Sequence, residues 1–167
     1  LNTAVENYVD VPDFEFREGI HLQSVSFRYP NTERDVLSNI DLSIHYGECI
    51  GIVGETGSGK STLVDIILGL LKTSQGTLLI DKKYPANAYQ WHKKIGYVPQ
   101  AVYLVDDSIE ANIAFGEKPE AVDTEALSRA ISGAQLDKLI KQLPAGTKTI
   151  VGERGVRLSG GERQRIA

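Results

Sequence analysis

The chain has little of what marks secreted, membrane-spanning or nucleic-acid-binding proteins. Its 167 residues contain one cysteine, Cys49, which excludes an internal disulfide and favours a packed thiol in a cytosolic setting. No stretch reaches the roughly twenty apolar residues of a membrane helix, and no basic-then-apolar leader is seen. The net charge of −4 gives no general attraction to nucleic acid, although a local basic patch stays open. These absences predict a soluble domain with no nucleic-acid partner.

The length and apolar content suit one domain with a hydrophobic core. Residues 1–19 mix charges, Pro12 and scattered aromatics without a sustained period, and we interpret them as a linker that enters the domain. The rest of the chain, 20–167, has no internal repeat or low-complexity tract. We therefore expect one domain over 20–167.

The apolar pattern predicts strands in the first part of this domain. Some segments alternate apolar and polar side chains, as half-exposed strands do, and others are short apolar runs typical of buried strands. The predicted strands are 21–27, 40–44, 48–53 (which includes Cys49), 77–80 and 95–98. A turn is expected at 29–31, between the first two.

Helical spacing appears twice. A helix is expected from Lys60 to the break at 74–76, with a buried face made of Leu63, Ile66, Ile67, Leu70 and Leu71. The pattern turns helical again over about 107–143, with one apolar stripe made of Ala126, Leu127, Ala130, Ile131 and Ala134.

A glycine-rich segment joins the predicted strand 48–53 to the helix at Lys60. It fits the P-loop pattern Gly-x-x-x-x-Gly-Lys-Ser, in the strand-then-helix context that this pattern requires. Its glycines permit tight turns that point backbone N–H groups at phosphate oxygens, and the helix adds its positive dipole end. We expect Lys60 to reach the β- and γ-phosphates and Ser61 to ligate Mg²⁺. The residues predicted to bind the nucleotide triphosphate here are Gly54, Glu55, Thr56, Gly57, Ser58, Gly59, Lys60, Ser61 and Thr62.

A second segment, Leu158–Arg165, has the pattern of a helix start. Ser159 stands where an N-cap belongs, and Gly160 and Gly161 permit a close approach of another group. A helix start binds anions well, although on its own such a segment is more often merely a cap.

Together these segments resemble the nucleotide-binding domain of ABC transporters, specifically the exporter branch, over nearly all of 20–167. The other matching segments are Phe27-Arg28-Tyr29-Pro30, Val36-Leu37, Pro99-Gln100 and Thr149-Ile150-Val151-Gly152-Glu153-Arg154-Gly155. The resemblance implies an α/β fold. It implies a P-loop NTPase core with a mostly parallel sheet, an N-terminal antiparallel β subdomain, and a helical subdomain over about 101–167.

The resemblance also implies roles for residues that would otherwise be ordinary. Tyr29 alone would be a turn or edge-strand aromatic, but the family's aromatic at this place stacks on adenine, with Val36 packed near the base. Gln100 alone would be a solvated amide, but the family's glutamine ligates Mg²⁺ or orients the attacking water. ATP and Mg²⁺ are thus the expected cofactors, and Lys60 and Gln100 the expected catalytic residues.

The remaining implications concern partners. Ser159, Gly160, Gly161 and Glu162 would contact ATP held by a second nucleotide-binding domain, in a head-to-tail dimer. A transmembrane domain is expected upstream in the same chain, which places the protein at the cytoplasmic face of a membrane. The apolar run 101–105 would contact short helices of that membrane domain, with local packing as an equal alternative.

The sequence departs from the family in two respects. Glu162 replaces the usual glutamine, and a carboxylate near a triphosphate is unfavourable unless it points away or caps the helix. The chain also stops at Ala167, within the signature helix, before the family's Asp-Glu strand and later histidine. We therefore expect an incomplete, marginally stable domain that binds ATP far better than it hydrolyses it.

Two other functional classes stay open. A soluble ABC ATPase of the DNA-repair or translation type shares the P-loop and signature, although 149–155 and the acidic charge count against it. A catalytically inactive cassette that binds nucleotide only to hold a dimer together is the other. The transported substrate is not encoded in this stretch.

Overall fold

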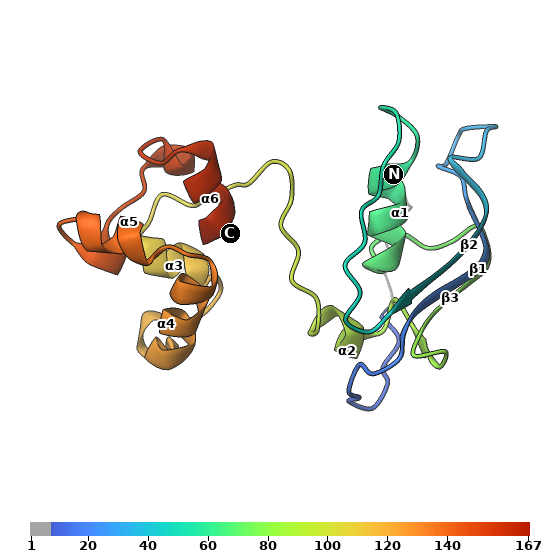
Figure 1. The fold of residues 1–167 in the computed structure, drawn as a ribbon, viewed down its shortest axis with the longest axis horizontal. Coiled ribbons are helices and arrows are strands. Elements are labelled where there is room, and N and C mark those ends of the chain that lie inside the picture. The colour runs from blue at the N-terminus through green and yellow to red at the C-terminus, as the bar shows by residue number, and fades with distance from the viewer. Residues whose placement is uncertain (1–7) are drawn as a thin grey trace. The chain divides into compact units, whose positions relative to one another are not determined.

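The computed structural model describes residues 8–167, and the chain divides into two compact units between Gly96 and Tyr97. We call them the N-terminal unit and the C-terminal unit, and Figure 1 colours them from blue to yellow-green and from yellow to red. The N-terminal unit contains β1 (Gly19–Phe27), β2 (Leu37–His45), α1 (Lys60–Ile67), β3 (Gln75–Ile80), β4 (Tyr84–Pro85) and α2 (Tyr89–His92). The C-terminal unit contains α3 (Ile109–Ile113), α4 (Thr124–Gly133), α5 (Asp137–Gln142), α6 (Gly160–Ile166) and the 3₁₀ helices η1 (Pro119–Ala121), η2 (Gly146–Lys148) and η3 (Glu153–Gly155).

The N-terminal unit is built on an antiparallel sheet with the order β2-β1-β3-β4. The predicted strands 21–27, 40–44 and 77–80 are confirmed as parts of β1, β2 and β3. β1 carries an irregularity at Ser24, whose φ is +48°, so the inward face continues as Leu22, Val25 and Phe27. All three are almost fully buried, and they form the centre of the core.

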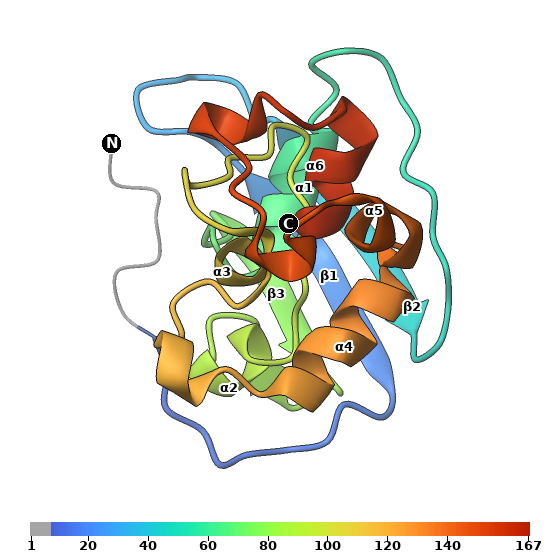
Figure 2. The same ribbon diagram turned by 90° about the vertical axis from the view of Figure 1, so that its left-hand side faces the viewer.

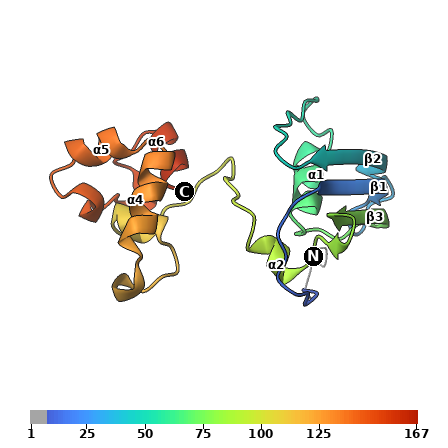
Figure 3. The same cartoon turned by 60° about the horizontal axis from the view of Figure 1, so that its bottom comes forward.

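Helix α1 packs against one face of this sheet (Figure 3). Ile66 is buried, and Leu63 and Ile67 pack against the same core. The helix ends at Ile67, so the prediction that it runs on to 74–76 is wrong. Gly69 takes φ +74° and donates to the carbonyl of Ile66, while Leu70 N–H reaches the carbonyl of Asp65 at 2.9 Å. This pair of hydrogen bonds is a Schellman termination, and it turns Leu70 outward.

The predicted strands 48–53 and 95–98 are not formed as strands. Among residues 8–167 no neighbouring strand pairs with either segment, and an unpaired segment gains no ladder hydrogen bonds. Most of their side chains are consequently exposed, with Val53 at 91% and Val98 at 57%, whereas Ile95 is half-buried against the core. The prediction of a packed thiol at Cys49 is therefore wrong, because the thiol lies in this exposed segment.

Part of the segment interpreted as a linker packs onto the N-terminal unit. Phe14 is buried and stacks on Tyr84 with ring centroids 3.9 Å apart, and Phe16 lies 5.3 Å from the ring of Trp91. Packing thus begins before residue 20, and the first seven residues lie outside the described range. The role of 1–19 as a linker stays a prediction.

Asp81 fastens the same segment to the sheet. Burial alone would raise its pKa, but backbone N–H groups of Gly19, Glu18 and Arg17 donate to its carboxylate and lower the pKa below 3.8. Charge-assisted hydrogen bonds to Asp81 therefore hold the backbone in place where the chain enters β1.

The C-terminal unit packs short helices around a second core (Figure 2). Helix α3 contacts α4 and α6. The core side chains are Leu104, Ile109, Ile131, Leu136, Val151, Leu158 and Ile166. The predicted helical region 107–143 is confirmed as α3, η1, α4 and α5. The predicted stripe is only partly buried: Ile131 lies in the core, whereas Ala126 and Ala130 are exposed.

No helix among residues 8–167 is long and apolar enough to cross a membrane.

Candidate functional site

The P-loop enters α1 through two glycines in left-handed conformations, Gly57 with φ +83° and Gly59 with φ +90°. Gly59 is the N-cap of α1, so no side chain caps the first turn, and no acidic residue lies in that turn. The first N–H groups of α1 and its positive dipole end are thus left to an outside anion. This end of the helix fits phosphate oxygens.

Lys60 is folded back over the loop. Its Nζ donates to the carbonyl oxygen of Gly54 at 2.9 Å and to that of Glu55 at 2.6 Å. The ammonium group therefore contacts two carbonyl groups of the P-loop, the same loop in which a phosphate would bind. Both acceptors are neutral carbonyls, so phosphate oxygens would be stronger partners for the same charge.

The predicted base-side residues lie directly against the P-loop helix. The Tyr29 hydroxyl is 3.1 Å from Thr62 Oγ1, and Thr62 is buried at the start of α1. A Cβ at Gly59 would lie 3.1 Å from the Val36 carbonyl and 3.2 Å from Val36 Cγ1. The structure therefore brings together Tyr29, Val36 and the P-loop, which are distant in sequence.

A polar hollow of about 410 Å³ is bordered by Tyr29. It is lined by Ser26, Arg28, Tyr29, Pro30, Asn31, Thr32, Asp35, Ser74 and Gln75. Thr32 N–H donates to the Tyr29 carbonyl at 3.3 Å, which confirms the turn expected at 29–31. Tyr29 thus borders open space and also has fixed contacts with Thr62 and Phe27.

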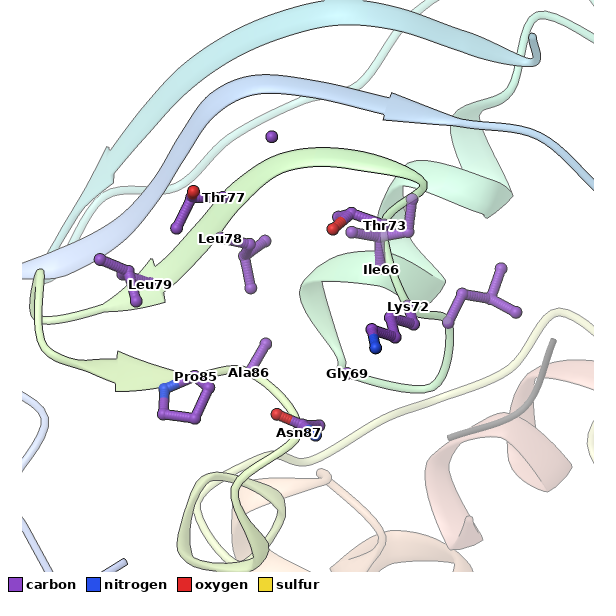
Figure 4. Close-up of a pocket in the computed structure, with 12 residues that line it drawn as sticks. Ile66, Gly69, Lys72, Thr73, Thr77, Leu78, Leu79, Pro85, Ala86 and Asn87 are labelled. Atoms are coloured by element: carbon purple, nitrogen blue, oxygen red, sulfur yellow. The ribbon is translucent and has the colours of Figure 1, made fainter. Parts of the chain in front are cut away.

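A separate, more apolar cavity of about 250 Å³ lies between the end of α1 and the β3–β4 hairpin (Figure 4). Ile66, Leu78 and Ala86 form part of its wall, and Lys72 and Thr73 lie on the α1 side. None of the predicted site residues lines it.

The other predicted site residues belong to the C-terminal unit. Gln100 is exposed in a bend before α3. Ser159 is the N-cap of α6, and Gly160, Gly161 and Glu162 form the first turn. These residues belong to a different unit from the P-loop, and their roles stay predictions.

Glu162 caps α6 instead of pointing at an anion. Its Oε2 accepts from the Ser159 N–H at 2.7 Å, while Ser159 Oγ accepts from the Glu162 N–H at 3.3 Å. This is a reciprocal capping box, and the backbone hydrogen bond from Ser159 lowers the pKa of Glu162 below 4.5. The departure from glutamine therefore has a local structural explanation.

Asn112 is a structural residue that the sequence reasoning missed. Its Oδ1 accepts from Val105 N–H at 2.8 Å, and its Nδ2 donates to the carbonyls of Val105 and Ser108 at 3.1 and 2.9 Å. The buried amide thus fastens the segment after Gln100 onto α3. The available signal was an asparagine four residues after the N-cap Ser108, on the face that also carries Ile109.

The run 101–105 is divided between core and surface. Leu104 is buried in the C-terminal core and Val102 packs against it, whereas Tyr103 is 72% exposed. Local packing accounts for the first two side chains, and Tyr103 is left without it.

A P-loop at an uncapped helix start, with an aromatic turn beside it, defines the class of P-loop nucleotide-binding domains. The family model described as ABC transporter matches residues 37–167. The chain therefore belongs to the ABC transporter family, as an ATP-binding domain.

Individual relatives agree with this assignment. The chain is 43% identical over 152 residues to the uncharacterized ABC transporter ATP-binding protein YfiB of Bacillus subtilis, covering 89% of this chain and 26% of that protein. It is 40% identical over 155 residues to the ATP-dependent lipid A-core flippase of Chromobacterium violaceum, covering 90% and 26%.

A solved structure shares the fold. The structure of a bacterial Atm1-family ABC exporter with ATP bound superposes with a TM-score of 0.80 at 33% identity, covering 96% of this chain and 29% of that chain. The chain thus spans about a quarter of the length of the relatives it matches.

Proposed function

We propose that this chain is the ATP-binding part of an ABC exporter that uses ATP binding and hydrolysis to move a substrate across a membrane. The observation that carries the proposal is the contact of Tyr29 and Val36 with a P-loop helix that begins without a cap. Base-side and phosphate-side groups are adjacent, as one nucleotide requires. Similarity to a flippase and to an Atm1-family exporter favours transport over the soluble class.

Residues of the P-loop would hold the triphosphate. Backbone N–H groups around Gly57 and Gly59 would donate to phosphate oxygens, and Lys60 would exchange the carbonyls of Gly54 and Glu55 for them. Tyr29 would present its ring to adenine. ATP supplies the anhydride bond whose cleavage would drive the conformational cycle.

Ser61 and Gln100 are the proposed Mg²⁺ ligands. The Ser61 side chain is exposed at the first turn of α1. A hydroxyl and an amide oxygen are hard donors that suit Mg²⁺. Gln100 lies in the other unit, so its part in the same site is an inference from the family.

The signature turn would act on a second copy of the domain. Its Ser159, Gly160 and Gly161 are exposed. The Glu162 carboxylate is held by the Ser159 N–H, so it is already partnered when a γ-phosphate approaches. We propose a head-to-tail dimer that closes on ATP and reopens after hydrolysis, below a transmembrane domain at the cytoplasmic membrane face. The mostly parallel core sheet that the family resemblance implies is also part of this proposal, since the sheet β2-β1-β3-β4 is antiparallel.

Calorimetric titration of MgATP into the chain tests the nucleotide site. We expect saturable heat for the parent and none for Lys60→Ala, because the variant loses the ammonium group that would exchange the carbonyls of Gly54 and Glu55 for phosphate oxygens. Lys72→Ala is the matched control, since Lys72 lines the separate cavity. Equal heats for the parent and Lys60→Ala would contradict the proposal.

A further inference from the structure

We infer that the Tyr29 hydroxyl is a positioning group that ties the base-side ring to the P-loop helix through Thr62. The inference rests on the proposed nucleotide function and adds a determinant to it. It concerns the hydroxyl and not the ring face, and it predicts that phenylalanine at position 29 is not equivalent to tyrosine.

The first support is the bond itself. Tyr29 Oη and Thr62 Oγ1 are 3.1 Å apart, a hydrogen-bond distance between two hydroxyl groups. Thr62 is only 6% exposed, so water competes little for this bond. The two residues are 33 positions apart in sequence, so the bond joins the turn after β1 to the first turn of α1.

The second support is that the hydroxyl and the other contacts constrain the ring in different ways. Phe27 meets the Tyr29 ring edge-on, with centroids 4.8 Å apart and planes at 89°. Tyr29 also borders a polar hollow and is half-buried against the N-terminal core. Because the hydroxyl oxygen lies on the long axis of the ring, its hydrogen bond fixes the direction of that axis, while the contact with Phe27 orients the ring plane.

The physical consequence is a fixed distance between the stacking surface and the phosphate loop. One nucleotide must satisfy both at once, so an ordered ring avoids the entropy of ordering it on binding. Thr62 lies two residues after Lys60, so the bond holds the ring to the same helical turn that presents N–H groups to phosphate. Loss of the hydroxyl should therefore weaken the binding of ligands that carry a base and leave the binding of bare phosphate chains unchanged.

The test compares two ligands, MgATP and inorganic tripolyphosphate, on the parent and on Tyr29→Phe. For Tyr29→Phe we expect the Kd of MgATP to rise about three- to tenfold, the effect of one lost neutral hydrogen bond. The Kd of tripolyphosphate should stay within about twofold, because the P-loop is untouched. Thermal unfolding of both proteins reports whether the variant is folded.

Thr62 gives the same test from the other end of the bond. Thr62→Ser retains the hydroxyl and should retain the preference for MgATP over tripolyphosphate. In a Thr62→Val background, Tyr29→Phe should cause no further loss of MgATP affinity, because the bond is already absent. Additive losses would overturn the inference.

The other outcomes are equally decisive. Unchanged MgATP affinity in Tyr29→Phe would overturn the inference and leave the proposed function standing. Equal weakening of both ligands would mean that the hydroxyl supports the loop itself, which also overturns the positioning role. A parent chain that binds neither ligand would overturn the proposed function together with this inference.

Discussion

The two units achieve order by different means. In the N-terminal unit, β1 pairs with both β2 and β3, and long-range backbone bonds surround one apolar core. In the C-terminal unit the helices α3, α5 and α6 have five, six and seven residues, too short to persist alone. Three helices there have a side-chain N-cap, from Ser108, Asp123 and Ser159. A sheet stabilises many residues jointly, whereas the helices α3, α4 and α6 are each begun by a side-chain cap of their own.

The largest effect should come from truncating the sheet core. Phe27→Ala removes a ring that is 2% exposed, and we expect a loss of about 3–5 kcal/mol in the free energy of unfolding. Urea unfolding followed by circular dichroism measures it. Phe115→Ala is the control in the other unit, because Phe115 is 75% exposed and should change stability by less than about 0.5 kcal/mol. Similar losses in both variants would contradict this ranking.

A smaller effect should follow from removing the Asn112 side chain, whose hydrogen bonds fasten the segment before α3 in the C-terminal unit. Asn112→Ala removes the acceptor of the Val105 N–H, whereas the carbonyls of Val105 and Ser108 each keep a backbone donor. The unpartnered N–H should reduce the free energy of unfolding by about 1–3 kcal/mol. Hydrogen exchange at Val105 should accelerate with it. Gln142→Ala replaces an exposed amide and serves as the comparison. An unchanged exchange rate at Val105 would contradict the role of Asn112 in holding this segment.

The smallest effect should appear on acidification. Glu110 accepts hydrogen bonds from Lys148 and Thr147, and the Lys148 bond is the main cause of a pKa below 4.5. A lowered folded-state pKa contributes stability above the ordinary value, and that stability is lost as pH falls through the folded value. The stability difference between the parent and Glu110→Gln should therefore shrink below about pH 4. Unfolding curves measured at several pH values test this. A stability difference between the two proteins that does not change with pH would contradict the prediction.

The sequence predicted features that depend on short-range pattern. Strands β1 to β3, the start of α1 at Lys60 and the N-cap at Ser159 all follow from alternation, glycine placement and capping residues. It did not predict the end of α1, because Gly69 stands inside an apolar run whose spacing continues past it. It also failed at 48–53, since a strand depends on a partner that its own residues do not specify.

The candidate site was likewise predictable only in part. The P-loop was predictable because its chemistry is local, and its geometry in the structure suits an anion. The contact between Tyr29 and Thr62 was not, because the pattern that indicates an aromatic turn says nothing about what its hydroxyl meets. Buried amides such as Asn112 escape prediction for the same reason: their partners are backbone groups.

Trp91 gives the N-terminal unit a built-in optical reporter. It is the only tryptophan in the chain, is 5% exposed, and donates from Nε1 to the carbonyl of Ile67 at 3.1 Å. Ile67 is the last residue of the helix whose first residue is Lys60. The indole emission therefore comes from one defined place, at the opposite end of the phosphate-binding helix. Its wavelength and quenching should follow movements of that helix without any attached dye.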